Sequence, residues 1–223
     1  MSNTQKRIAS ALVLALIVGI CIFLGTKATL ALLMVVGAIC VDELYCNFFK
    51  GNRKGLFYVV AQAIFLVPFG YLNFLEQAPH LYSMFVNAGV VTNFVLLIYL
   101  FYLDMDSKLL TGLMQKFPFL SALLVLFPLM SMAALFQYSE WISLVVVLLF
   151  VNFGMDTGAW FFGKNFGKNK LWPKVSPNKT IEGLVGGSLT SGVIGGIFYL
   201  ILFKNMSVQL FIFFVFLGVM SQV

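Results

Sequence analysis

Charged side chains are scarce in this chain: Asp, Glu, Lys and Arg make up 10% of its 223 residues, whereas hydrophobic residues make up 61%. A soluble domain of ordinary composition carries about a quarter charged residues, so this chain has too little polar surface to cover one aqueous core. The apolar runs are continuous rather than alternating, which argues against a transmembrane β-barrel. The composition therefore predicts an all-α polytopic integral membrane protein.

Histidine and cysteine are also rare. His80 is the only histidine, which excludes a histidine-rich metal site, and we expect it in a solvated external loop. The three cysteines, Cys21, Cys40 and Cys46, form an odd set without paired spacing, which argues against a disulfide framework. We interpret them as small apolar fillers. No low-complexity segment or soluble domain interrupts the apolar series, and no nucleic acid is expected as a partner.

Apolar runs near 20 residues, the length that crosses a bilayer as a helix, recur about eight times. The first follows Lys6-Arg7 and resembles a signal peptide, but it is too long for a typical signal and no A-x-A site follows it, so we interpret it as an uncleaved helix. The predicted spans are Ile8–Gly25, Ala28–Tyr45, Leu56–Leu75, Leu81–Leu103, Phe117–Phe136, Trp141–Phe162, Glu182–Phe203 and Val208–Gln222.

The basic residues predict the orientation. With the N-terminus in the cytoplasm, only Lys27 and Lys204 face outward, which is a strong positive-inside signal. We therefore expect a multi-pass protein of the inner (cell) membrane, with residues 1–136 forming about five N-terminal helices and residues 137–223 a catalytic-type region whose basic loop, 163–181, is cytoplasmic. The inward residues are Lys6, Arg7, Lys50, Arg53, Lys54, Lys108, Lys116, Lys164, Lys168, Lys170, Lys174 and Lys179.

Asp156 lies inside the sixth predicted span, where a carboxylate costs about 2.5–3.5 kcal/mol at the centre of a helix and less near its end. Asn152, four residues earlier, shares a face with Asp156, whereas Gly154 and Gly158 lie on the opposite face. We expect the polar face to line a wet cavity and the small-residue face to pack closely on a neighbouring helix. The alternative is that Asp156 pairs with a lysine and only holds helices together.

The connection after this span is basic, because it contains five lysines and no acidic residue lies between Asp156 and Glu182. Such a loop suits a polyanion such as nucleotide phosphates or a lipid phosphate, although attraction to the anionic membrane surface would also explain it. Ser176-Pro177 predicts a helix start, with serine as the cap and proline at the first position. Free N–H groups at that end would bind phosphate.

Glycines follow Glu182. We expect Gly183, Gly186 and Gly187 to allow close approach of a ligand or of another backbone. For Gly192, Gly195 and Gly196, plain helix packing is the favoured interpretation.

The ordered combination of these motifs resembles the phosphatidate cytidylyltransferase family, also called CDP-diacylglycerol synthases. The family pattern runs D-x-G-A-Y, G-x-x-x-G-K, S-P-K-K-T-x-E-G and G-G; this chain has Trp160 where tyrosine is usual and Asn178 where the first lysine is usual. The matching residues are Asp156-Thr157-Gly158-Ala159-Trp160, Gly163, Gly167-Lys168, Lys170-Leu171, Pro173, Ser176-Pro177-Asn178-Lys179-Thr180-Ile181-Glu182-Gly183 and Gly186-Gly187.

The resemblance implies that CTP and phosphatidic acid react at the bilayer to give CDP-diacylglycerol and pyrophosphate. It implies Mg²⁺ as cofactor, with or without a second, monovalent cation, and Asp156 as a metal ligand from this chain. Catalytic roles are implied for Asp156, Lys179 and Glu182, the last orienting Lys179 or the metal's waters. Substrate binding is implied for Lys164, Lys168, Ser176, Pro177, Asn178, Thr180, Gly183, Gly186 and Gly187.

The best-known signature of the family, which supplies acidic metal ligands, follows a segment that resembles Met220-Ser221-Gln222-Val223. We therefore expect this chain to be a truncated member or a fragment, with further ligands beyond Val223. Related CTP-dependent lipid enzymes, of the CDP-archaeol synthase or polyprenol kinase type, stay open as alternatives. A non-catalytic membrane protein, a transporter of anionic solutes and a homodimeric state also stay open.

Overall fold

The structure is a computed structural model that describes residues 3–48, 50–75, 78–102, 112–113, 116–172 and 176–222. The chain divides into two compact units, Met1–Ser139 and Glu140–Val223. Each unit is described by itself. The predicted roles of the two parts, five N-terminal helices and a catalytic-type region, stay predictions.

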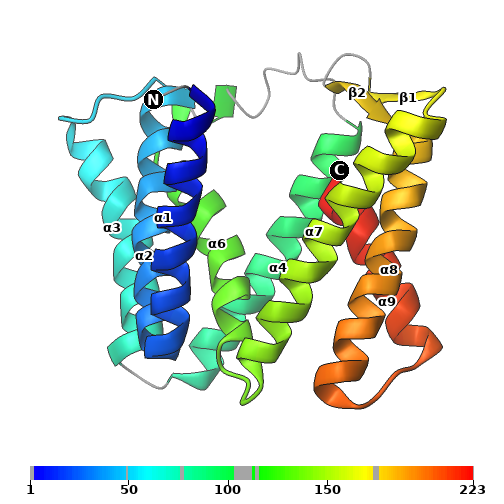
Figure 1. Cartoon of the computed structure of the whole chain (residues 1–223). Coiled ribbons are helices and arrows are strands. Elements are labelled where there is room, and N and C mark those ends of the chain that lie inside the picture. Colours follow the sequence, from blue (N-terminus) through cyan, green and yellow to red (C-terminus); the bar gives the residue numbers. More distant parts are fainter. Residues whose placement is uncertain are drawn as a thin grey trace. The chain divides into compact units, whose positions relative to one another are not determined.

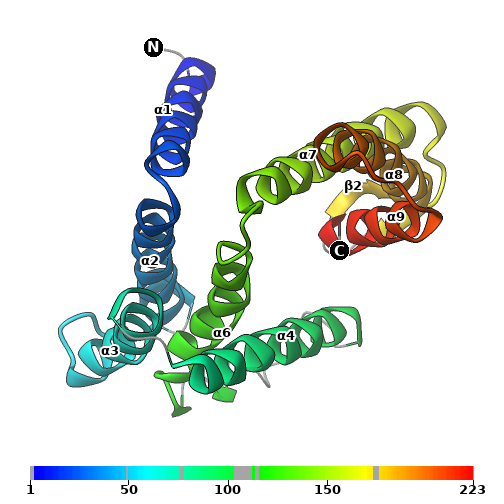
Figure 2. The same cartoon turned by 90° about the horizontal axis from the view of Figure 1, so that it is seen from below.

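The first unit is built from helices (Figures 1 and 2). Gly25, with a φ of 98°, separates the first two, because a residue with a side chain rarely adopts that conformation. All five spans predicted here contain a helix. The elements are α1 (Asn3–Leu24), α2 (Thr26–Glu43), a π-helical turn at Leu44–Phe48, α3 (Leu56–Gly70), a second π-helical turn at Tyr71–Leu75, α4 (Pro79–Tyr102) and α6 (Leu120–Leu135).

Helix α6 organises the core of this unit, because it contacts α2, α3 and α4. Its Leu126 and Met130 are buried, as are Phe65 and Phe69 of α3. The rings of Phe65 and Phe69 stack with their centroids 5.5 Å apart. Such packing is how helices associate in a bilayer, where lipid tails are as apolar as the side chains.

The second unit contains α7 (Trp141–Phe166), a hairpin of β1 (Lys170–Trp172) and β2 (Ser176–Thr180), α8 (Ile181–Phe203) and α9 (Val208–Gln222). The three helices lie side by side in both views (Figures 1 and 2). Lys204, with a φ of 53°, ends α8 in the left-handed conformation, and α9 begins four residues later. The tight connection predicted between the last two spans is thus confirmed.

Helices α7 and α8 approach each other through glycines. A Cβ at Gly154 would lie 2.6 Å from Cδ1 of Ile194, and one at Gly187 would lie 2.8 Å from the carbonyl oxygen of Met155. At Gly158 the side chain of Thr190 occupies the space that a Cβ would need. The prediction that the small-residue face of the sixth span packs on a neighbouring helix is therefore confirmed.

Glycines on the other side of α8 make the contact with α9. A Cβ at Gly192 would lie 2.5 Å from Val215, and one at Gly195 would lie 2.8 Å from the ring of Phe214. Plain helix packing, the interpretation favoured for these glycines, is confirmed.

Three predictions need correction. Ser176 and Pro177 do not begin a helix: they belong to β2, in which Ser176 pairs with Trp172 and Thr180 pairs with Lys170. Helix α8 instead begins after Thr180, whose hydroxyl caps it by accepting from the N–H of Gly183 at 3.1 Å. The sixth span also continues to Phe166, so Gly163 and Lys164 are helical, and the chain is not purely α-helical because of the hairpin.

Four helices in the described part of the chain are long and apolar enough to cross a membrane: Thr26–Asn47, Leu56–Leu75, Trp141–Phe166 and Ile181–Phe203. Shorter apolar helices cover Leu12–Leu24, Leu120–Leu135 and Val208–Ser221. The chain is accordingly a helical, multi-pass type of membrane protein.

Candidate functional site

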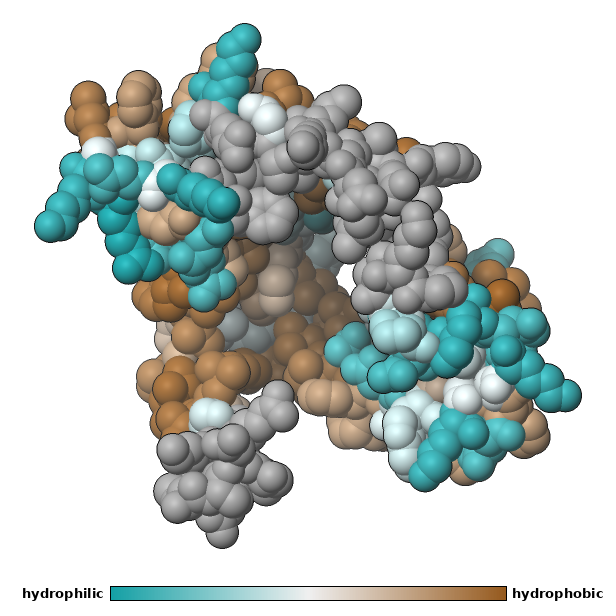
Figure 3. Space-filling view, turned by 90° about the horizontal axis from the view of Figure 1, so that it is seen from above, coloured by the Kyte–Doolittle hydropathy of each residue, from teal (hydrophilic) through white to brown (hydrophobic). Residues whose placement is uncertain are grey.

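The hairpin marks one end of the second unit, where α7 ends and α8 begins (Figure 1). Hydrophilic residues gather over this end in the space-filling view (Figure 3). Lys164, Lys168 and Lys170 are exposed and Lys179 is half-buried. Pro173 and Lys174 lie outside the described residues. The four described lysines among the five that the sequence singled out therefore lie at one end, as a polyanion site would require.

The packing of Thr180 against Gly163 and Gly167 joins the segment that begins α8 to the end of α7. A Cβ at Gly163 would lie 3.1 Å from the hydroxyl oxygen of Thr180, and one at Gly167 would lie 2.8 Å from its methyl group. The two glycines thus leave room for Thr180 against the end of α7. Because Thr180 is 7% exposed and its hydroxyl caps α8, it has a structural role here.

Hydrogen bonds between Asn169 and Glu182, together called the bracket below, join the two ends of the hairpin. The Glu182 carboxylate accepts from the Asn169 side-chain amide at 2.8 Å and from its backbone N–H at 3.2 and 3.3 Å. The carbonyl oxygen of Asn169 in turn accepts from the N–H of Ile181 at 3.0 Å. This bracket holds the turn that carries Lys168 and Lys170 against the first turn of α8. Sequence reasoning missed Asn169, because only the hairpin brings it near Glu182.

The bracket and the cap also change the expectation for the start of α8. The N–H groups of Ile181 and Gly183 already donate within the protein. The start of α8 therefore offers a phosphate fewer free donors than a bare helix terminus does. The exposed lysine side chains, rather than the helix end alone, are therefore the groups at this end that remain to attract an anion.

Asp156 belongs to an exposed stripe on α7. Asn152, Asp156, Trp160 and Lys164 follow one another at intervals of four residues, and all four are exposed. Asn152 accepts from the hydroxyl of Ser221 in α9 at 3.1 Å, and the ammonium group of Lys164 lies 5.0 Å from the centre of the Trp160 ring. Asp156 itself lies about 15 Å along the helix axis from Phe166, at 1.5 Å per residue. The stripe links the acidic position inside the helix to the lysine end.

The remaining predicted site residues lie in two different environments. Ser176 is half-buried, and Pro177 and Asn178 are exposed on the hairpin. Gly183 and Gly187 are instead buried against α7, where a Cβ would lie within 3 Å of the carbonyl oxygens of Ala159 and Met155. Gly186 is buried in the same interface, against the ring of Phe162. In this structure the three glycines approach the neighbouring helix rather than an open surface.

The residues present fit Mg²⁺ only in part. No group of three or more acidic, histidine or cysteine side chains that could hold a metal occurs among the described residues. The Glu182 carboxylate is hydrogen-bonded to Asn169. The exposed carboxylate of Asp156, on the α7 stripe, remains as the candidate ligand for a metal. One carboxylate is compatible with Mg²⁺, which keeps several waters and binds through one or two carboxylates and substrate phosphates.

Comparison with known proteins identifies the family of this chain. The chain belongs to the cytidylyltransferase family, whose model matches residues 5–223. The chain is similar to the phosphatidate cytidylyltransferase of Staphylococcus saprophyticus, with 38% identity over 85 residues (36% of this chain, 33% of that protein). It is also similar to the enzymes of that name from Bacillus subtilis, with 51% identity over 51 residues (23% and 19%), and Staphylococcus aureus, with 46% over 56 residues (25% and 22%).

The matched segments span between 19% and 33% of the length of these curated relatives. No solved structure matches the chain.

Proposed function

We propose that this chain supplies the lysine-rich part of a phosphatidate cytidylyltransferase, which transfers CMP from CTP to phosphatidic acid and releases pyrophosphate. The family and the names of the relatives support this assignment. The observation that carries it is the hairpin of the second unit. There Lys168 and Lys179 lie beside the start of α8, at the end of a stripe that leads to Asp156.

The proposed topology has eight membrane helices, a cytoplasmic N-terminus and an inner-membrane location. It is supported by the uneven distribution of lysine and arginine along the sequence, which follows the positive-inside rule. This orientation puts the hairpin in the cytoplasm, where CTP is available.

The proposed reaction is an in-line displacement at phosphorus. A phosphate oxygen of phosphatidic acid attacks the α-phosphorus of CTP, so that one P–O bond forms. The bond from the α-phosphorus to the bridging oxygen breaks, and that oxygen leaves with the pyrophosphate together with the bonding electron pair. Positioning and neutralisation of charge supply most of the catalysis in such transfers.

The chain's own residues divide this work. Lys168 and Lys179 attract and orient the phosphates as point charges, and Lys164 adds charge at the end of α7. Asp156 would hold Mg²⁺ through its carboxylate, and the ion would neutralise charge on the phosphate oxygens. The exposed α7 stripe gives the lipid headgroup a polar path from the bilayer to the lysine end.

The test uses the protein expressed from its complete gene and reconstituted in liposomes. CTP-dependent formation of CDP-diacylglycerol is measured for Asp156→Asn and Lys179→Ala, with and without Mg²⁺. We expect both variants to lose at least about tenfold in rate, the effect of about 1.4 kcal/mol on the barrier. Lys204→Ala, which removes an exposed lysine at the opposite end of α8, is the matched control. Unchanged activity in both variants would remove these residues from the mechanism.

A further inference from the structure

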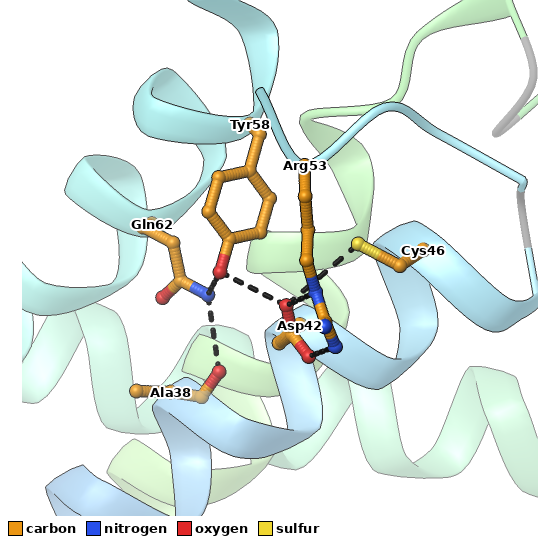
Figure 4. Close-up of polar contacts among 6 residues, drawn as sticks. All are labelled: Ala38, Asp42, Cys46, Arg53, Tyr58 and Gln62. Atoms are coloured by element: carbon orange, nitrogen blue, oxygen red, sulfur yellow. Dashed lines mark hydrogen bonds and ion pairs between the residues drawn. The ribbon is translucent and has the colours of Figure 1, made fainter. Parts of the chain in front are cut away.

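The first unit contains a second cluster of polar side chains, which the proposed reaction does not use (Figure 4). Asp42 and Cys46 come from α2 and the turn after it, Tyr58 and Gln62 from the start of α3, and Arg53 from the connecting loop. The Asp42 carboxylate accepts from Nε of Arg53 at 2.8 Å, from Nη2 of Arg53, and from the hydroxyl of Tyr58 at 2.9 Å.

An ion pair between helix and loop would explain these contacts alone, but the Arg53 guanidinium has N–H donors beyond those that the pair uses. A guanidinium carries five N–H donors; the bonds to Asp42 come from Nε and Nη2, and Cys46 also contacts the guanidinium. The Arg53 side chain is 62% exposed, whereas that of Asp42 is 20% exposed. The pair therefore holds Arg53 in place while its outer edge remains open to an anion.

The loop that carries Arg53 is fixed by its own hydrogen bonds. The N–H of Gly51 donates to the carbonyl oxygen of Tyr45 at 2.8 Å, and the side chain of Asn52 accepts from the N–H of Lys54 at 3.0 Å. Lys50 and Lys54 flank Arg53 in the sequence. Hydrophilic residues gather over this loop in Figure 3. The loop that carries Arg53 is thus held in place by the protein's own hydrogen bonds.

An apolar groove of about 460 Å³ begins at this cluster. Its apolar walls include Val35, Ala38 and Ile39 of α2 and Leu66 of α3, and its polar end is formed by Asp42, Tyr58 and Gln62. Val35 and Ile39 are 57% and 55% exposed, so the groove is open along the side of α2. Two turns of α3 separate Tyr58 at the polar end of the groove from Leu66 at its apolar end.

Gln62 supplies an independent sign of an occupant. Its amide nitrogen donates to the carbonyl oxygen of Ala38 at 3.1 Å and to the hydroxyl of Tyr58 at 3.3 Å. Its carbonyl oxygen is buried and has no hydrogen-bond partner in the described part of the chain. In Figure 4 this oxygen points away from Tyr58. An unpaired buried acceptor is costly, and a hydroxyl group beside it would satisfy it.

We propose that this groove binds a single-chain anionic phospholipid with a free hydroxyl on its glycerol backbone. The Arg53 guanidinium, held by Asp42 at the mouth of the groove, the Gln62 acceptor and the apolar walls follow one another in the order in which such a lipid presents phosphate, hydroxyl and acyl chain. The acyl chain lies against Ala38 and Leu66, the hydroxyl donates to Gln62, and the phosphate accepts from Arg53. A diacyl lipid fits less well, because its ester carbonyls are acceptors and cannot satisfy Gln62.

The proposed ligand is the monoacyl precursor of the substrate class of the proposed function. An acyltransferase that moves an acyl group from an activated acyl donor to the free hydroxyl, with release of the donor's carrier and the hydroxyl proton, would convert it into a diacyl phosphate monoester. The binding site is independent of that function, because all of its groups lie in the first unit.

The test measures lipid retention by the purified full chain in detergent, by native mass spectrometry and without CTP. The lipids are oleoyl lysophosphatidic acid, dioleoyl phosphatidic acid, oleoyl lysophosphatidylcholine and monooleoylglycerol. Groove-dependent retention, taken as the difference between the protein and Ala38→Phe, excludes lipid bound at the substrate site of the second unit. We expect it to be at least about fivefold greater for the first lipid than for each of the others, the effect of one net hydrogen bond or one charge contact. Equal groove-dependent retention of any of the other three lipids would overturn the proposal.

Variants locate the binding. Ala38→Phe fills the groove and should abolish the preference, whereas Val36→Phe, on the same helix but outside the groove, should preserve it. Gln62→Leu should leave lysophosphatidic acid and phosphatidic acid equally retained, and this variant serves if Ala38→Phe fails to fold. Retention by Ala38→Phe equal to that of Val36→Phe would contradict the proposal. Asp156→Asn should retain the lipid normally, which separates this test from that of the enzymatic function.

Discussion

The contact between α7 and α8 can be tested by adding one methyl group. In Gly187→Ala the new Cβ would lie 2.8 Å from the carbonyl oxygen of Met155 and 2.9 Å from Cβ of Ala159, whereas ordinary contacts begin at 3.4 Å. The oxygen belongs to the backbone and cannot rotate away, so the helices must separate by roughly half an ångström. Overpacking of this kind costs about 1–3 kcal/mol.

The assay is thermal unfolding of the purified protein in detergent. A loss of 1–3 kcal/mol lowers the melting temperature of a chain of this size by about 2–12 °C. Gly19→Ala is the matched control, because Gly19 is also inside a helix and a Cβ there meets no atom within 4 Å. The double variant Ala159→Gly/Gly187→Ala should recover part of the loss. It removes the close contact with Cβ of Ala159 but keeps the one with the carbonyl oxygen of Met155.

The result that would refute this reasoning is a melting temperature of Gly187→Ala equal to that of Gly19→Ala. Helices α7 and α8 would then not pack in this register. The hairpin is attached to both of them, so its lysines would lose the positions on which the proposed function depends. A normal melting temperature with a raised KM for CTP would instead indicate that Gly187 contacts substrate, as the sequence resemblance implied.

Three further outcomes are expected. Thr180→Ala should destabilise the protein by about 0.5–2 kcal/mol through loss of the cap on α8, whereas Thr180→Ser should retain it; equal melting temperatures for the two variants would contradict the capping role. Asn169→Ala should raise the KM for CTP with little change in kcat, because the turn bearing Lys168 is released while the reacting groups remain; an unchanged KM would show that the bracket with Glu182 does not position the lysines. In a background without Cys21, Cys40 and Cys46, a membrane-impermeant thiol reagent should label Asn178→Cys only in inside-out vesicles and Lys27→Cys only in intact cells; the reverse pattern would exclude the proposed orientation.

The helices could be predicted from the sequence because bilayer-length apolar runs have few alternatives. The predicted span Leu56–Leu75 is occupied throughout by α3 and the π-helical turn that follows it. The small-residue face of α7 was predictable for a similar reason, since Gly154 and Gly158 are one turn apart and must share a side of a helix.

The start of α8 could not be predicted in the same way. Ser176-Pro177 is a good helix start by local preference, but pairing of Ser176 with Trp172 keeps the segment extended. Thr180 can cap α8 only because Gly163 and Gly167 leave space beside it. Both effects depend on segments that are separate in the sequence, as does the bracket between Asn169 and Glu182. Local preferences do not contain this information.

The candidate site therefore depends on packing that lies outside it. Lys168 and Lys179 are long, flexible side chains, and what fixes their starting points is the backbone beneath them. That backbone is held by Thr180, which packs against Gly163 of α7 and Gly167 just after it, and by the hydrogen bonds of the Glu182 carboxylate with Asn169. In this structure the Glu182 carboxylate holds the turn, and its predicted catalytic role stays a prediction. It follows that substitutions in the α7–α8 interface should alter the binding of anionic substrates without removing any group that contacts them.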